Sequence, residues 1–394
     1  MIPFSPPRID QRVIDEVVDT LKSGWITTGP KTKEFERRLT AYCGNKATLA
    51  VNSNTVGLEV VLRWFGVQEG DEVIVPAYTY CATANVIVHC GAKPVMVDVN
   101  ADDFDVCLEK VREAITDKTK VIMPVDLGGM PCAYDELFEL VEAEDVKMLF
   151  QAKTEEQKKL GRILILSDSA HSIGAEYKGR KAGSLADVSV FSFHAVKNLT
   201  TAEGGATMLN LPEPFDNEEV YRYLCTYTLH GQNKDALAKT KKGAWRYDVL
   251  VSGFKGNMTD IMASIGLVEL SRYEDDTLHY RKCIYDQYTD AFSRYGWAEL
   301  PIYETEDRKS SYHVYCLRVK GITEQQRDEI IQRHFQPLPL LCAFKNKGYK
   351  IEDYPVAYDN YCREISLPVW YGLSEEMVKT VIDAVICSVE EVLA

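Results

Sequence analysis

The sequence predicts an α/β protein with a central, mostly parallel sheet flanked by helices, followed by a smaller α+β part. Short apolar runs rich in β-branched residues alternate with helical stretches from about residue 47 to residue 193, as in sheets covered by helices on both faces. This alternation ends after Met208, and the last hundred residues combine a single strand-like run with helices. We therefore expect a large domain over 1–290, with helices at its N-terminus, and a small C-terminal domain over 291–394.

The first half of the chain shows the alternation in order. Two amphipathic helices, 9–22 and 31–43, are separated by a loop in which Gly24, Gly29 and Pro30 break the helical spacing. Strands are then predicted at 47–52, 71–76, 93–99, 120–125, 163–168 and 188–193, with helices at 55–66, 83–91, 107–115 and 133–143. The charged stretch 142–162 interrupts the alternation, and we expect it to form a surface helix or flap.

The second half of the chain is predominantly helical. Long helices are predicted at 258–276 and 277–296, a strand at 313–319, and further helices at 323–334 and 374–393.

The composition argues against several classes of function. With 45 basic and 59 acidic side chains the net charge is −14, which disfavours binding to nucleic acid or to anionic membranes. No apolar run approaches the ~18 residues that span a bilayer, and the N-terminus lacks the pattern of a signal peptide. The eleven cysteines form no CxxC pair and the seven histidines show no metal-ligand spacing. A cytoplasmic enzyme with reduced thiols and no metal is expected.

An acid and a lysine stand at the ends of two predicted strands. Asp168 ends the strand 163–168, while Ser192 and Lys197 follow from the strand 188–193. Open α/β sheets hold ligands at the carboxyl ends of their strands, although a simple ion pair on a loop would give the same pattern.

Three further segments could belong to the same site. Residues 53–55 (Ser-Asn-Thr) stand between a strand and a helix, where they could bind an anion or serve only as an N-cap. Tyr80 follows another strand and could stack on a planar ring or pack in the core. The loop containing Trp25 and Thr28 could line a pocket or merely turn the chain.

An anion site, an aromatic ring, a carboxylate and a lysine together suit pyridoxal phosphate. Its phosphate needs a helix N-terminus, its ring an aromatic neighbour, its pyridine nitrogen an acid, and its aldehyde a lysine. A nicotinamide oxidoreductase is the alternative on such a sheet, but no G-x-G-x-x-G sequence follows any predicted strand.

Several pieces of the chain resemble the DegT/DnrJ/EryC1/StrS aminotransferases, the sugar aminotransferases of fold type I. They run in the family's order: SGWITTGPKTKEFE (23–36), GDEVIVPAYTYCATANVI (70–87), SDSAHSIGA (167–175), SVFSFHAVKNLTTAEGGA (189–206), GFKGNMTDIMASIGLVEL (253–270) and ISLPVWYGLSEE (365–376). The resemblance implies an aspartate-aminotransferase-like large domain that binds pyridoxal 5'-phosphate.

The resemblance also implies a role for each matching residue. Lys197 corresponds to the lysine that forms the internal aldimine and then shuttles the proton, and Asp168 to the acid paired with the pyridine nitrogen. His171 would lie near the 3-hydroxyl of the ring, and Tyr80 would stack on the ring. The implied phosphate ligands are Asn54, Thr55 and Ser192, with Ser53 in the same turn.

Other implied residues lie near the substrate or a second subunit. Lys255 matches the position that reaches the phosphate across a homodimer with shared active sites. Trp25 and Thr28 match a loop that faces the sugar nucleotide, and His334 matches a C-terminal histidine of the family. Asp126 departs from the pattern, since it stands where a histidine often lies.

The resulting hypothesis is a transaminase that moves an amino group from an amino acid, L-glutamate, to a nucleotide-linked keto sugar by way of pyridoxamine phosphate. Polysaccharide biosynthesis is the corresponding process. Two alternatives keep the same fold: a pyridoxal-phosphate-dependent sugar dehydratase and a non-catalytic regulatory protein. Dehydratases of this family usually replace the lysine by histidine, so Lys197 argues against the first.

Overall fold

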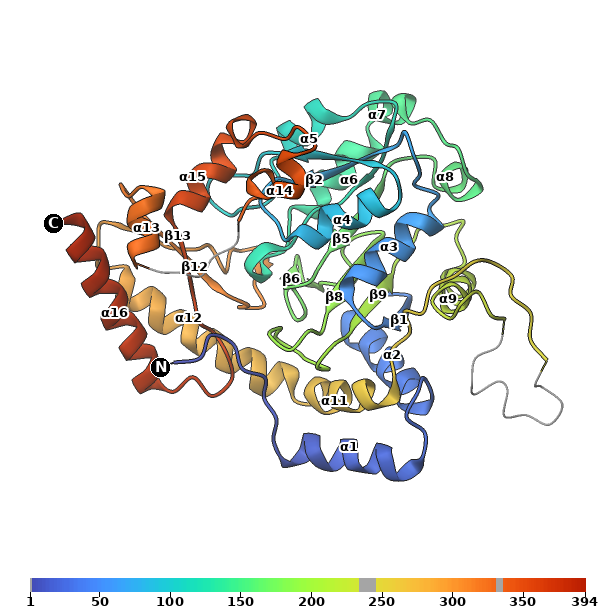
Figure 1. Ribbon diagram of the computed structural model, residues 1–394, viewed down its shortest axis with the longest axis horizontal. Helices are drawn as coiled ribbons and strands as arrows, with labels where there is room; N and C mark the ends of the chain where they lie inside the picture. Colours follow the sequence, from blue (N-terminus) through green and yellow to red (C-terminus); the bar gives the residue numbers. More distant parts are fainter. Residues whose placement is uncertain (1, 234–245, 331–335) are drawn as a thin grey trace.

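A seven-stranded sheet forms the centre of the computed structural model, which describes residues 2–233, 246–330 and 336–394 (Figure 1). In sheet order its strands are β1 (Ala47–Val51), β9 (Gly205–Leu209), β8 (Val188–Ser192), β5 (Leu164–Asp168), β4 (Thr119–Ile122), β2 (Glu72–Pro76) and β3 (Lys93–Val97). Only β9 runs against its neighbours, pairing antiparallel with both β1 and β8. The mostly parallel sheet predicted from the sequence is confirmed, and β9 is an addition to it.

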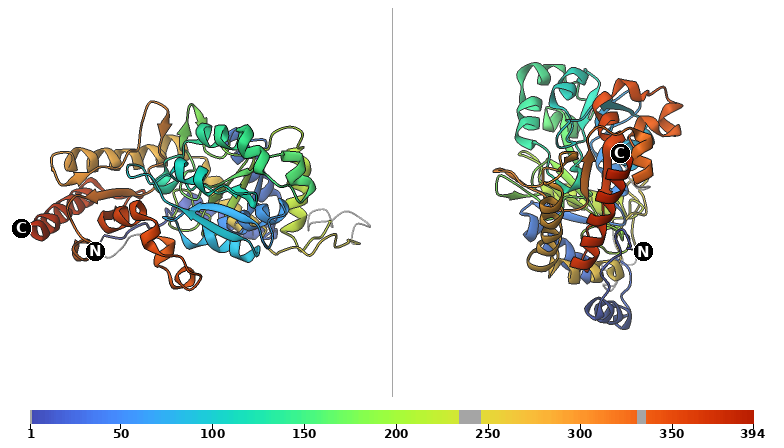
Figure 2. Two further views of the ribbon diagram at one scale, coloured as in Figure 1. Left: turned by 90° about the horizontal axis from the view of Figure 1, so that it is seen from above. Right: turned by 90° about the vertical axis from the view of Figure 1, so that its left-hand side faces the viewer.

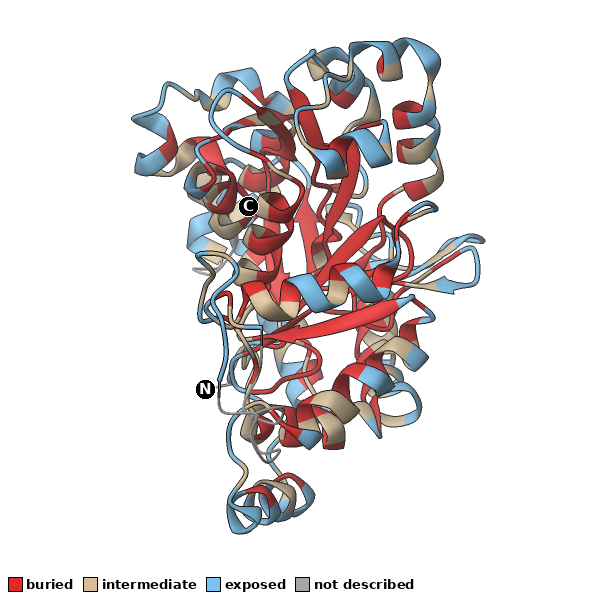
Figure 3. Ribbon diagram, turned by 90° about the vertical axis from the view of Figure 1, so that its right-hand side faces the viewer, coloured by how far each residue is buried: buried red, intermediate tan, exposed pale blue. Residues whose placement is uncertain are grey.

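Helices cover both faces of this sheet, as predicted. They are α2 (Pro30–Cys43), α3 (Asn54–Trp64), α4 (Cys81–His89), α5 (Leu108–Ala114), α6 (Tyr134–Glu142), α9 (Asn217–Tyr227) and α11 (Asp260–Leu270), and α1 (Gln11–Ser23) packs on α11. Two buried apolar clusters lie on opposite faces: one contains Leu58 of α3, and the other Phe35 of α2. In Figure 3 the strands are buried along their length while the helices turn exposed faces outward.

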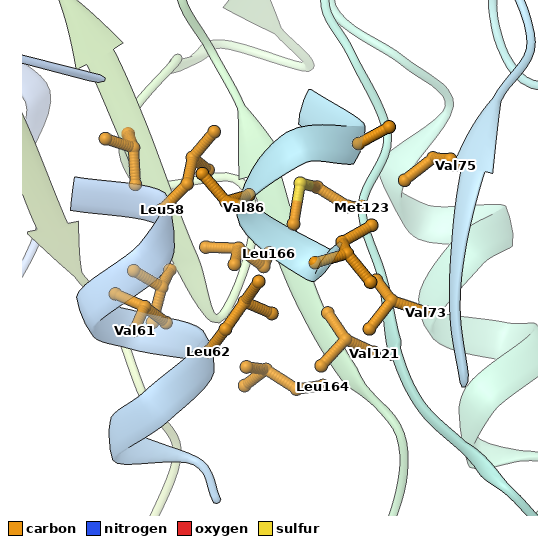
Figure 4. Close-up of a cluster of buried hydrophobic side chains, with 14 of the residues drawn as sticks. Leu58, Val61, Leu62, Val73, Val75, Val86, Val121, Met123, Leu164 and Leu166 are labelled. Atoms are coloured by element: carbon orange, nitrogen blue, oxygen red, sulfur yellow. The ribbon is translucent and has the colours of Figure 1, made fainter. Parts of the chain in front are cut away.

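The strands are buried on both faces, which explains their continuous apolar runs. Figure 4 shows one such contact, where Leu58 and Leu62 of α3 lie against Leu164 and Leu166 of β5. All four side chains are fully buried. Each contributes roughly 1.5–3 kcal/mol relative to an exposed side chain. This packing fixes the orientation of β5, whose last residue is Asp168.

A second, smaller sheet lies toward the C-terminus. It consists of β10 (Ala298–Glu299), β12 (Tyr315–Val319) and β13 (Glu364–Leu367), surrounded by α12 (His279–Phe292), α13 (Glu324–Ile330), α15 (Pro355–Arg363) and α16 (Glu375–Leu393). Except for α15, whose Ala357 and Tyr361 belong to the cluster that contains Leu58, these elements enclose a third apolar cluster, to which α12 contributes Ile284 and Tyr288. In the left view of Figure 2, α12 and α16 lie together at one end of the molecule. The division of the chain at residue 290 stays a prediction.

Several local elements differ from the sequence-based expectation. The charged stretch 142–162 forms two short helices, α7 (Glu144–Leu149) and α8 (Glu155–Leu160). The predicted helix 258–276 ends early, because a π-helical turn over Tyr273–Leu278 separates α11 from α12. The hydroxyl of the buried Tyr273 donates to the carbonyl of Ile173 at 2.7 Å, which ties this turn to the loop after β5. Residues 331–334 of the predicted helix 323–334 lie outside the described residues.

Candidate active site

A cavity of about 420 Å³ lies where β5 and β8 end. These strands are parallel neighbours, so the acid and the lysine that follow them are brought to one edge of the sheet, as predicted. Eight of the predicted site residues line the cavity: Ser53, Asn54, Thr55, Tyr80, Asp168, His171, Ser192 and Lys197. They come from the ends of four strands and meet only in the folded chain.

Asp168 is buried at the end of β5 and is held by two side-chain donors. The amide of Asn54 donates to one carboxylate oxygen at 3.1 Å, and the hydroxyl of Thr83 donates to the other at 2.8 Å. Burial raises the pKa of Asp168, while these two hydrogen bonds and the charge of Lys197 lower it. The carboxylate is therefore fixed in orientation at the cavity. Thr83, one turn into α4, was not singled out by sequence reasoning.

Lys197 lies on the loop that follows β8 and lines the same cavity. Its backbone N–H donates to the carbonyl of His194 at 2.9 Å, which closes the turn 194–197. Burial lowers the pKa of Lys197 to about 8, against the opposing effect of the Asp168 charge. An amine with this pKa is partly neutral at pH 7 and can act as a nucleophile.

The turn before α3 contributes Ser53, Asn54 and Thr55 to the lining of the cavity. Ser53 is the N-cap of α3, accepting from the N–H of Val56 at 3.2 Å, and Asn54 and Thr55 open the helix. Gly205 lets β9 lie close to this turn, because a Cβ there would lie 2.6 Å from the nitrogen of Asn54. A helix N-terminus with adjacent hydroxyls, Ser192 included, suits a phosphate group.

A second histidine adjoins His171. The rings of His171 and His313 stack with their centroids 4.2 Å apart and their planes at 28°. Nδ1 of His313 lies 2.7 Å from the side-chain oxygen of Asn198. For each histidine burial is the main cause, and Lys197 a further one, that lowers the pKa well below its usual value. His313 also lines the cavity, but it stands 142 positions after His171, and no local pattern marks it.

Asp126 is buried among hydrogen-bond donors away from the cavity. Its carboxylate accepts from the hydroxyl of Tyr134 at 2.8 Å, the hydroxyl of Ser172 at 2.6 Å and the N–H of Cys132 at 3.1 Å. The bond from Ser172 ties the loop that carries His171 to Asp126. Burial raises the pKa of Asp126.

Trp25, Thr28 and Lys255 lie together but do not line this cavity. The ammonium of Lys255 donates to the side-chain oxygen of Asn257 at 2.5 Å, and the amide of Asn257 donates to the hydroxyl of Thr28 at 2.5 Å. The indole N–H of Trp25 donates to the carbonyl of Thr28 at 3.1 Å. The last predicted site residue, His334, lies outside the described residues.

Among the described residues, no helix combines the length and apolarity needed to cross a membrane.

Known proteins resemble this chain along nearly its whole length. The model of the DegT/DnrJ/EryC1/StrS aminotransferase family matches residues 7–386. An uncharacterised protein of Methanocaldococcus jannaschii, MJ1066, is 37% identical over 98% of this chain and 96% of its own length. The spore coat polysaccharide biosynthesis protein SpsC of Bacillus subtilis is 34% identical over the same shares.

The solved structures give the same picture. The putative sugar aminotransferase Spr1654 of Streptococcus pneumoniae superimposes in its PMP form with a TM-score of 0.95, at 48% identity and with complete coverage of both chains. Its PLP form superimposes with a TM-score of 0.94, at 47% identity and also over both complete chains.

Proposed function

Because the chain belongs to the DegT/DnrJ/EryC1/StrS aminotransferase family and is a pyridoxal-phosphate-dependent aminotransferase, we propose that it aminates a nucleotide-linked keto sugar. The proposed amino donor is L-glutamate. The observation that carries this is the cavity in which Lys197, with its lowered pKa, shares one sheet edge with the buried Asp168. The names of Spr1654 and SpsC support a sugar acceptor used in polysaccharide biosynthesis.

The cavity residues fit the cofactor in charge and in shape. The N-terminus of α3 with Ser53, Asn54 and Thr55 would hold the phosphate together with Ser192. Gly205 leaves this turn open, since a larger residue would collide with it. Asn54 would contribute its backbone N–H, because its side-chain amide is already bonded to Asp168 and to the carbonyl of Val190.

The ring would lie between the other residues of the cavity. Asp168 would pair with the pyridine nitrogen, and its carboxylate is already oriented by Asn54 and Thr83. Tyr80, which is 63% exposed, has a free face that could stack on the ring. His171 would lie near the 3-hydroxyl.

Bound pyridoxal phosphate supplies an aldehyde that combines with amines and a ring that takes up the electrons of a broken Cα–H bond. The protein supplies the proton transfers and the charge. In each half-reaction Lys197, partly neutral near pH 7, would carry a proton between the substrate carbon and the cofactor. Asp168 would hold a proton on the ring nitrogen, because a buried carboxylate stabilises a cation beside it. His171 and His313, both kept neutral, add no competing positive charge.

We further propose a homodimer with shared active sites. Three predicted site residues lie outside this chain's own cavity: Lys255, Trp25 and Thr28. This position agrees with a contribution to the active site of a second subunit. Lys255 would reach the partner's phosphate, and the Trp25 loop would face the partner's sugar nucleotide.

The helix α1 also carries an exposed apolar stripe of Ile14, Val18 and Leu21, at 45%, 39% and 52% exposure. In Figure 1 this helix stands out from the body of the molecule, where a second copy could cover it. A role for His334 in substrate binding stays a prediction from the sequence.

A cytoplasmic location is part of the proposal. All eleven cysteines lie within the described residues and are free thiols, which agrees with a reducing compartment.

The amino-transfer proposal has a direct test. Protein loaded with pyridoxal phosphate is mixed with L-glutamate, and the loss of the yellow cofactor band is followed by spectroscopy. The resulting amine form is then offered a panel of UDP- and dTDP-linked keto sugars, and amino sugar formation is measured by mass spectrometry. We expect glutamate to bleach the band and one class of keto sugar to restore it.

The matched variants are Lys197→Ala and Lys110→Ala, the second altering an exposed lysine on α5 outside the cavity. Lys197→Ala should abolish both steps, and Lys110→Ala should leave them unchanged. A protein that takes up no pyridoxal phosphate, or a fully active Lys197→Ala variant, would refute the assignment. Dehydrated sugar without an amino group would indicate the dehydratase alternative.

A further inference from the structure

The segment that precedes α1 runs along the cavity. Residues 3–8, which we call the N-terminal strap, belong to no helix or strand. Ile2 packs against the apolar cluster around the small sheet, and Phe4, two residues later, packs against a cluster of the large sheet. Figure 1 shows this segment passing beside the chain that leads into α16 before it reaches α1. The strap therefore connects the two apolar cores at the edge of the cavity.

Three contacts anchor the strap. The hydroxyl of Ser5 donates to the carbonyl of Val196 at 3.0 Å, next to Lys197 in the chain. The indole N–H of Trp370 donates to the carbonyl of Pro3 at 3.0 Å.

Arg8 forms the third anchor. Its guanidinium lies 3.5 Å from the centre of the Tyr371 ring and pairs with Asp276 at 2.7 Å. Asp10 lies 3.6 Å from Nε of Arg8, so this side chain has two anionic partners and an aromatic one within the protein.

The sequence of the strap makes it stiff. Pro3, Pro6 and Pro7 fix their own φ angles, and a residue before proline is restricted to extended conformations. Phe4 and Ser5 are thus flanked on both sides by prolines. Little conformational entropy is lost when such a segment is held against a ligand.

Phe4 and Ser5 line the cavity that contains Lys197 and Asp168. Together with Val196 and Val369, Phe4 gives this side of the cavity an apolar character. Glutamate, with two carboxylates, calls for cations and hydrogen-bond donors. A pyranose ring presents a face of C–H groups, for which an aromatic side chain is the better partner.

We propose that the N-terminal strap is a wall of the amino-acceptor site and that Phe4 is a specificity-determining residue that packs against the sugar. This inference rests on the proposed function. Ser5 positions the wall through its bond to the loop of Lys197. We expect the donor amino acid not to depend on the strap, because its two carboxylates call for cations and hydrogen-bond donors.

Measuring the donor and the acceptor half-reaction separately tests whether Phe4 acts on the sugar alone. In the holoenzyme, Phe4→Ala should lower kcat/KM for the keto sugar nucleotide about tenfold, which corresponds to about 1.4 kcal/mol. The rate with L-glutamate should stay within about twofold of wild type, since a dicarboxylate gains little from contact with an aromatic ring. Phe4→Tyr keeps the ring and should restore the acceptor reaction. Leu149→Ala, which alters an exposed apolar side chain on α7, is the matched control and should change neither half-reaction.

Hydrogen exchange gives a readout that does not depend on activity. The amides of Phe4, Ser5 and Arg8 should exchange more slowly when UDP-glucose or dTDP-glucose, which carry no keto group, is added to the holoenzyme. Unchanged exchange with both compounds would overturn the inference.

The kinetic outcomes are equally decisive. An acceptor half-reaction of Phe4→Ala equal to wild type would overturn the inference, as would equal losses in both half-reactions, which indicate general loosening. A wild-type enzyme that aminates no keto sugar nucleotide would instead refute the proposed function itself, before any variant is compared.

Discussion

Thr83 donates a hydrogen bond of 2.8 Å to Asp168, from the first turn of α4 to the end of β5. The two residues are 85 positions apart in the chain. The hydroxyl of Thr79 lies 2.9 Å from that of Thr83, so the carboxylate is the end of a short chain of buried hydroxyls. The proposed partner of the pyridine nitrogen is therefore oriented by a neighbouring helix rather than by its own strand.

Removal of the Thr83 hydroxyl should slow catalysis without abolishing it. A hydrogen bond to a charged group contributes about 1.5–3 kcal/mol, and its loss would raise the pKa of Asp168 further. We expect Thr83→Val to lower kcat by roughly tenfold or more. Thr83→Ser keeps the hydroxyl and serves as the control. Steady-state kinetics with L-glutamate would measure both, and equal rates for Val and Ser would contradict the role.

The low pKa of Lys197 should appear in the rate at which the apoprotein captures pyridoxal phosphate. Only the neutral amine attacks the aldehyde, and with a pKa of about 8 roughly one-tenth of the lysine is neutral at pH 7. The capture rate should therefore rise about tenfold per pH unit below pH 8 and level off above it. Stopped-flow absorbance would follow the yellow product. A rate still rising steeply at pH 9.5 would indicate an ordinary lysine, whose pKa lies near 10.4.

Gly205→Ala should damage both stability and cofactor binding. The added Cβ would lie 2.6 Å from the nitrogen of Asn54, and β9 cannot move away because β1 and β8 flank it. Overpacking of this kind costs about 1–3 kcal/mol. Gly296→Ala is the control, since a Cβ there meets nothing within 4 Å. Thermal unfolding and titration with pyridoxal phosphate would test the pair, and similar melting temperatures for the two variants would show that the turn can shift.

The sequence could predict those parts of the site that follow from local pattern. Strand composition located β5 and β8, and with them the ends at which Asp168 and Lys197 stand. Thr83, His313 and Gly205 could not be found in this way, because their importance comes from packing between distant segments.

Short elements escaped prediction for a related reason. The strands β6 (Glu176–Tyr177) and β7 (Arg180–Lys181) have two residues each, too few to show an alternating pattern. The N-terminal strap has no secondary structure at all, and only the three-dimensional fold reveals that Phe4 lines the cavity.

The shared active site can be tested by mixing two inactive subunits. In a homodimer of the proposed kind, Lys197 of one subunit and Lys255 of the other belong to the same site. We expect Lys197→Ala to be inactive alone, and Lys255→Ala to be inactive at limiting pyridoxal phosphate, since it loses a cation near the phosphate. A dimer containing one copy of each variant has one intact site and one doubly altered site. Random mixing makes half of the dimers mixed, so about a quarter of wild-type activity should return.

Co-refolding of the two variants, followed by an activity assay, measures this recovery. In the control mixture Lys255→Ala is replaced by the active variant Lys46→Ala, which alters a lysine bonded to the carbonyl of Leu211 outside the cavity. About half of wild-type activity should remain there, because a quarter of the dimers keep two intact sites and half keep one. If the mixture of Lys197→Ala and Lys255→Ala stays as inactive as its parts, each site is built from a single chain.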